Sequence, residues 1–138
     1  MAMTRSSFHP HLAASLACLL FAAPVVASER ALTSTERRSQ HLTELSDYPW
    51  NLAEVGYQET RSSAALKDML STEGFTIQSN VADIPTAFVA SYGSGEPVIA
   101  IMGEFDALPG ISQDAVPFEQ KIAGKNAAQA CGHHLFGT

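Results

Sequence analysis

The sequence predicts an α/β fold in which helices pack on a mixed sheet, within one modest domain of the 138-residue chain. Three observations carry this prediction. Apolar residues recur at helical spacing between positions 60 and 74, and two later segments, 75–78 and 87–92, alternate as half-buried strands do. The run 97–102 is apolar on both alternating sets of positions, which is typical of a strand covered on both faces.

The first 27 residues are predicted to be a secretory signal peptide rather than part of the fold. Arg5 precedes an almost unbroken apolar run, 12–27, that ends in the small residue Ala27. The run is shorter than the ~20 apolar residues that a spanning helix needs, and Pro24 interrupts it. Cleavage after Ala27 would export residues 28–138 to the periplasm or outside the cell. Lipidation of Cys18 is a weaker alternative, because the residue three before it is Ser15.

Charge and cysteine content narrow the possible partners of the mature chain. Without residues 1–27 it has seven basic and fourteen acidic side chains, a net charge of −7 with neutral histidines. Nucleic acid is therefore excluded as an expected partner, and no membrane association is expected after removal of the signal. Cys131 is then the single cysteine and cannot form an internal disulfide. A lone exported thiol suggests either reactive sulfur or metal ligation.

The helices are expected in two places. Residues 29–47 are polar with sparse leucines, which favours an exposed helix that Pro49 ends. Thr60 is placed to cap a second helix with apolar positions at three-and-four spacing, and Gly74 is placed to stop it.

The strands are expected after this second helix. Residues 75–78 and 87–92 are predicted strands, Gly93–Gly95 a turn, and 97–102 a central strand covered on both faces. The segment 103–110 (GEFDALPG) leaves this strand with Glu104 and Asp106, and about twenty mostly polar residues without periodicity follow as a loop. Because ligands bind beyond the carboxyl ends of strands in open α/β sheets, both carboxylates are candidate site residues. The alternative is that they are ordinary solvated loop residues.

The last eight residues contain a thiol and two imidazoles in four positions, Cys131-Gly132-His133-His134. In an extended segment, residues two apart point to the same side, so Cys131 and His133 can reach one metal while His134 faces away. A thiolate with an imidazole suits zinc or a neighbouring divalent ion. Two alternatives stay open: a chance occurrence in a surface tail, and a nucleophilic Cys131 activated by a histidine.

Four segments together resemble the amino-terminal region of the zinc-dependent aminoacylase and carboxypeptidase family of amidohydrolases, namely 69–76, 85–95, 103–110 and the CGHH motif with Leu135 and Gly137. The match runs from about Thr35 to the last residue in the family's order. The combination of GEFDALPG with the cysteine motif is more specific than either motif alone. The resemblance implies a partial zinc-exopeptidase-like domain over residues 28–138.

The resemblance also implies roles for particular residues. Cys131 and His133 would supply two ligands to a two-metal site of zinc or manganese, and Asp106 would be the active-site aspartate that orients a ligand. Glu104 stands where the wider family has a histidine, and His134 where it more often has aspartate or asparagine. The resemblance assigns no role to these two residues.

The activity implied by the resemblance is metal-dependent hydrolysis of small amides, namely N-acyl or N-aroyl amino acids or dipeptides such as p-aminobenzoyl-glutamate. The family's general-base glutamate and later histidine ligands lie downstream of Thr138. The chain is therefore expected to be truncated and inactive alone, and part of a homo- or hetero-oligomer in full-length form. The alternative is an exported metal-binding or interaction module without catalysis, drawing further ligands from His41, the carboxylates or a second chain.

Overall fold

The structure is a computed structural model that describes the backbone of residues 11–138 and the side chains from Ser28 onward. The chain divides into two units, one of residues up to Ser39 and one of Gln40–Thr138, and each is considered by itself. The predicted signal peptide, residues 1–27, lies outside the described side chains. Its cleavage therefore stays a prediction.

Helix α1 runs from His11 to Leu52 and includes the expected helix at 29–47. Side chains in its exposed part bond back to the preceding turn, as when Thr33 Oγ1 donates to the Glu29 carbonyl at 2.9 Å. Leu42 and Leu45 are half-buried, whereas Leu32 is exposed. Within the described part of the chain, none of the helices combines the length and apolarity that crossing a membrane requires.

The prediction that Pro49 ends this helix is wrong, because α1 continues to Leu52. Proline cannot donate the helical hydrogen bond, but its carbonyl still accepts from the Ala53 N–H at 2.9 Å. Pro49 is fully buried in the structure. The contacts of its ring help to offset the lost hydrogen bond, and the helix ends one turn later, where Ala53 has a positive φ of 48°.

Helix α2, Thr60–Thr72, confirms the predicted second helix and its stop. Leu66 is its buried apolar residue, with Ser62 and Ser63 buried beside it. At the end of the helix, Gly74 has a φ of 92° and donates to the Ser71 carbonyl, while the Phe75 N–H donates to the Leu70 carbonyl. This is a Schellman motif, which favours glycine because of its positive φ.

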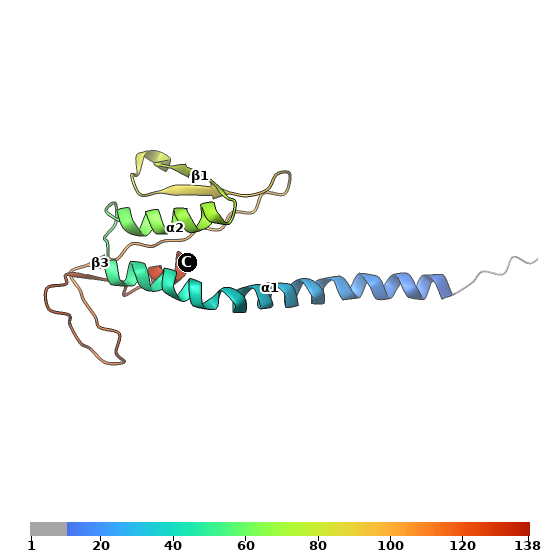
Figure 1. The fold of residues 1–138 in the computed structure, drawn as a ribbon, viewed down its shortest axis with the longest axis horizontal. Coiled ribbons are helices and arrows are strands. Elements are labelled where there is room, and N and C mark those ends of the chain that lie inside the picture. The colour runs from blue at the N-terminus through green and yellow to red at the C-terminus, as the bar shows by residue number, and fades with distance from the viewer. Residues whose placement is uncertain (1–10) are drawn as a thin grey trace, which may run out of the picture. The chain divides into compact units, whose positions relative to one another are not determined.

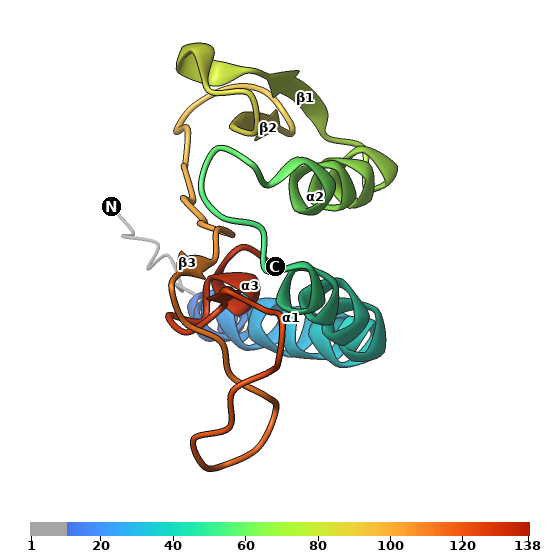
Figure 2. The ribbon, with the colours of Figure 1, turned by 90° about the vertical axis from the view of Figure 1, so that its left-hand side faces the viewer.

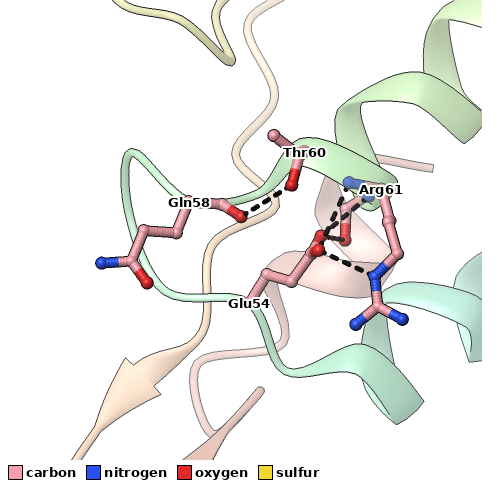
Figure 3. A network of polar contacts seen from close by, with 5 residues as sticks. Glu54, Gln58, Thr60 and Arg61 are labelled. Carbon is pink, nitrogen blue, oxygen red and sulfur yellow. Dashed lines mark hydrogen bonds and ion pairs between the residues drawn. The ribbon is translucent and has the colours of Figure 1, made fainter.

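The predicted cap of α2 is wrong, since Glu54 takes the role expected of Thr60. The Thr60 hydroxyl donates to the Gln58 carbonyl instead. The Glu54 carboxylate accepts from the Ser62 N–H at 2.9 Å, the Ser62 hydroxyl at 2.8 Å and the Arg61 N–H at 3.3 Å (Figure 3). A carboxylate from the preceding turn thus satisfies the orphan donors of the first helical turn.

The strands expected at 75–78 and 87–92 form an antiparallel pair. Strand β1, Thr76–Ser79, pairs with β2, Phe88–Ser91, and the 3₁₀ turn η1, Val81–Asp83, lies in their connection. Helix α2 lies against this pair (Figure 1). A buried chain of hydrogen bonds joins the two, because the Ser63 hydroxyl donates to the Thr86 carbonyl and the Thr86 hydroxyl donates to Glu59.

The prediction of a central strand at 97–102 is wrong, because this segment forms no strand and is exposed throughout. Val98, Ile99, Ile101 and Met102 are between 78% and 95% exposed. A central strand needs a neighbour on each edge and a covering layer on each face. The described residues supply neither, so the apolar pattern is present without the sheet that it suits.

The remaining elements are short and gather around the end of the exposed segment. Strand β3, Leu108–Pro109, pairs antiparallel with β4, Ala127–Ala128, and helix α3 spans His133–Phe136 (Figure 2). The loop between β3 and β4 is cross-linked, for instance by Gln120 Nε2 donating to Asp114 at 2.9 Å. The fold thus has the predicted mixture of helices and strands, although its two sheets are antiparallel and two-stranded.

The Glu54→Gln variant is expected to unfold about 1 kcal/mol more easily at neutral pH, because an amide is a weaker acceptor at a helix N-terminus. Burial alone raises the pKa of Glu54, but hydrogen bonds from Ser62 and Arg61 outweigh it and lower the pKa below its ordinary 4.5. Stability from the ionised carboxylate is therefore present above pH 4.5 and lost as pH falls through the lower folded pKa. Urea denaturation across acid pH should show the variant and the wild type converging, with Glu119→Gln as the matched exposed control; an unchanged midpoint at neutral pH would contradict the capping role.

The Ile101→Lys variant is expected to stay monomeric at concentrations at which the wild-type chain self-associates. Ile101 is 95% exposed within an apolar segment whose backbone is unpaired, and a lysine there discourages edge pairing. Static light scattering against concentration measures the difference. Equal scattering from both proteins would show that this segment does not drive association.

Candidate functional site

His133 lies between two carboxylates, one at each ring nitrogen. Its Nδ1 is 2.8 Å from Asp106 Oδ1, and its Nε2 is 3.1 Å from Glu104 Oε2. The His133 side chain is 21% exposed, that of Asp106 35% and that of Glu104 59%. The structure therefore brings together three of the residues that the sequence singled out, with the imidazole as the least exposed of them.

The carboxylates are placed by backbone pairing of the residue that follows them. The Ala107 N–H donates to the Glu54 carbonyl at 2.8 Å, and Ala107 forms a parallel bridge with Val55. Ala107 is only 1% exposed, so it is fixed from all sides. Because the bridge is followed at once by β3, the segment that carries Glu104 and Asp106 is anchored at its carboxyl end.

Gln129 joins this segment to α3, and sequence reasoning missed it. Its Nε2 donates to the Phe105 carbonyl at 3.2 Å, while its Oε1 accepts from the His134 N–H at 3.2 Å. The residue is 3% exposed. A glutamine that uses both ends of its amide in the interior holds two backbone segments at a fixed separation. Its local sequence, alanines on both sides, contains no motif that signals this role.

Two glycines allow α3 to approach the carboxylate segment closely. A Cβ on Gly137 would lie 2.7 Å from the Glu104 carbonyl oxygen and 3.1 Å from Phe105 Cβ. A Cβ on Gly103 would lie 3.3 Å from Gly137 Cα. Backbone therefore packs on backbone at this point, which requires the absence of side chains at both positions.

His134 faces a different environment from its neighbour. Its ring lies 5.0 Å from the ring of Trp50, centroid to centroid, and its buried Nδ1 has no hydrogen-bond partner among the described atoms. Burial lowers the pKa of His134, although the carboxylate of Asp47 opposes this effect. The structure thus places His134 against an aromatic side chain of α1 and away from the Glu104–His133–Asp106 cluster.

Cys131 is an exposed free thiol, and the expected extended geometry of its motif is wrong. Gly132 has a φ of 76°, and His133 begins α3, so the three residues form a turn into a helix. Alternation of side chains applies only to extended backbone. Whether Cys131 and His133 can serve one ion therefore depends on rotation of the exposed cysteine side chain.

The donor chemistry suits a divalent transition ion, but the set is incomplete. Thiolate, imidazole and carboxylate are all zinc ligands. Among the residues that the structure describes, however, no group of three or more histidine, cysteine, aspartate or glutamate side chains converges closely enough to hold a metal ion. As they stand, these residues form a pre-positioned part of a site.

The Gly137→Ala variant is expected to disrupt the cluster by pushing α3 away from the Glu104 backbone, since a Cβ there would clash with the Glu104 carbonyl. We expect the His133 Nδ1–H signal of the hydrogen bond to Asp106 to weaken or vanish in nitrogen-detected NMR. Gly124→Ala is a suitable control, because its Cβ would meet nothing within 4 Å. It shares the strain of a positive φ, 80°. A preserved signal in Gly137→Ala would show that the close approach is dispensable.

Comparisons with known proteins agree with the resemblance noted from the motifs. No family model matches the chain, and no solved structure matches it. The chain is 42% identical over 105 residues to one of the subunits of p-aminobenzoyl-glutamate hydrolase of Escherichia coli strain K12. The match covers 75% of this chain and 22% of that relative. The predicted resemblance is thereby confirmed: over three quarters of its length, the chain is similar to part of an amide hydrolase.

Proposed function

We propose that the chain supplies part of the active site of a metal-dependent amidohydrolase that cleaves N-acyl or N-aroyl amino acids or dipeptides. The relative is named for hydrolysis of p-aminobenzoyl-glutamate, and this compound is the proposed representative substrate. The observation that carries the proposal is the 2.8 Å contact between His133 Nδ1 and Asp106 Oδ1. A histidine that ligates a metal usually donates its other ring N–H to a carboxylate in this way.

In this arrangement Asp106 orients His133. The aspartate accepts from Nδ1–H, which selects the tautomer with a lone pair on Nε2 and limits rotation of the ring. Asp106 sits beside the anchored Ala107, so its position is itself constrained. Asp106 therefore acts as a positioning residue, and His133 presents Nε2 as a donor.

The proposed metal ligands are His133 and Cys131, with zinc or manganese as the ion and two ions in the complete enzyme. A bound divalent ion would polarise the scissile carbonyl and activate water. The described residues lack a complete set of donors, and no general base is assigned among them. Hydrolysis consequently requires further donors and a base from elsewhere in the enzyme, and the chain alone should not turn over an amide.

The proposed setting is outside the cytoplasm and within an oligomer. Export rests on the signal-like pattern of residues 1–27. Assembly with a second kind of chain rests on the relative's name, which distinguishes it by a letter as one subunit of its hydrolase. The acidic balance of the chain supports a small-molecule substrate rather than nucleic acid.

A chimera tests the function directly. The aligned segment of this chain replaces its counterpart in the Escherichia coli relative, in cells that otherwise lack that relative. Release of p-aminobenzoate from p-aminobenzoyl-glutamate is then measured in extracts, and we expect the chimera to retain the activity. A folded chimera that binds metal but releases no product would favour the alternative of a binding module without catalysis.

Within the active chimera, Cys131→Ser is expected to lower turnover by about 100-fold or more, because a thiolate ligand is lost. Asp106→Asn is expected to lower turnover by about 10- to 100-fold through loss of ring orientation. Glu119→Gln, an exposed loop carboxylate away from the cluster, should leave turnover unchanged. Wild-type rates for both Cys131→Ser and Asp106→Asn would contradict the assigned roles.

A further inference from the structure

We infer that Glu104 is a further protein ligand of the divalent cation held by His133, binding it through Oε2. The inference rests on the proposed function in one respect, that His133 holds a divalent cation at Nε2. It assigns a role to a residue that neither the motif nor the relative's name explains. Its basis is the position of Glu104 Oε2, 3.1 Å from His133 Nε2.

The first argument concerns protons and lone pairs. A neutral imidazole has one N–H and one acceptor nitrogen. If Nδ1–H donates to Asp106 at 2.8 Å, then the lone pair of Nε2 faces the carboxylate oxygen of Glu104. Two acceptors at this distance repel each other unless a cation lies between them. A divalent ion satisfies both, and the neighbouring thiol of Cys131 makes a transition ion the suitable one.

The second argument concerns distance. Zinc binds histidine nitrogen and carboxylate oxygen at about 2.0 to 2.2 Å, so two such ligands at angles between about 90° and 110° lie roughly 2.9 to 3.5 Å apart. The observed separation of 3.1 Å falls in this interval. Glu104 and His133 are therefore spaced as neighbouring ligands of one ion before any ion is bound.

The third argument distinguishes Glu104 from Asp106. Asp106 lies at Nδ1 and is engaged there, so it cannot also reach an ion at Nε2 on the other side of the ring. Glu104 is the more exposed carboxylate, at 59% against 35%, and an incoming ion can reach it. With rotation of the exposed Cys131 side chain, the set becomes thiolate, imidazole and carboxylate, which leaves one position of a tetrahedral ion open.

Cobalt(II), a spectroscopic substitute for zinc, tests the inference on the full 138-residue chain kept reduced. The chain is titrated with the ion while the thiolate-to-cobalt charge-transfer and d–d absorption bands are recorded. We expect binding with both bands in the wild type and about tenfold or more weaker binding in Glu104→Gln. Glu119→Gln removes the same charge from an exposed loop and should bind as the wild type does. Circular dichroism of each variant checks that the fold is retained.

The outcomes separate the two hypotheses. If the wild type binds cobalt and Glu104→Gln binds it equally well, Glu104 is no ligand and only this inference fails. If Glu104→Gln binds more tightly, Glu104 competes with the ion for His133, which also overturns the inference. If the folded wild type does not bind cobalt, both this inference and the metal site under the proposed function are wrong. If Cys131→Ser retains the charge-transfer band, the assigned thiolate ligand fails independently of Glu104.

Discussion

Glu54 joins the parts of the 40–138 unit on which the rest depends. Its carboxylate caps the first turn of α2 through Ser62 and Arg61, while its backbone carbonyl accepts from the N–H of Ala107. One residue thus links the helix that supports the β1–β2 pair to the segment that carries the site carboxylates. Buried backbone and helix-end groups need partners, and Glu54 satisfies both kinds at once.

From this junction the site is built by two further constraints. Gln129 holds the Phe105 carbonyl and the His134 N–H at either end of its amide. Gly103 and Gly137 let the two backbones approach within van der Waals contact. Because these constraints act on backbone, the position of His133 between its carboxylates follows from packing more than from the local preferences of the CGHH motif.

Sequence patterns predicted the local features of the fold and failed where the outcome depends on distant partners. The end of α2 at Gly74 was predictable because a positive φ has a direct sequence signature. The cap was not, because Glu54 lies outside the helix and reaches back to it. The segment 97–102 shows the same limit, since its apolar pattern states what a strand requires but not whether neighbours are present.

The candidate site shows how residue types and geometry contribute differently. The motifs named Cys131, His133 and Asp106 by their chemistry, and the structure places Asp106 on Nδ1 of His133. The motifs left Glu104 without a role and gave no sign of Gln129, because contacts made through the opposite ring nitrogen or through a buried amide leave no spacing in the sequence.

The distribution of exposure within the cluster has a physical consequence for metal binding. His133 and Asp106 are held in the less accessible part, whereas Glu104 and Cys131 lie at the surface. An ion can therefore first meet two mobile anionic donors and then a fixed imidazole. Ordering an exposed side chain costs little more than its rotamer entropy, while repositioning an anchored one would strain its surroundings. Such a division allows capture by the flexible donors while the fixed imidazole and its aspartate define the geometry.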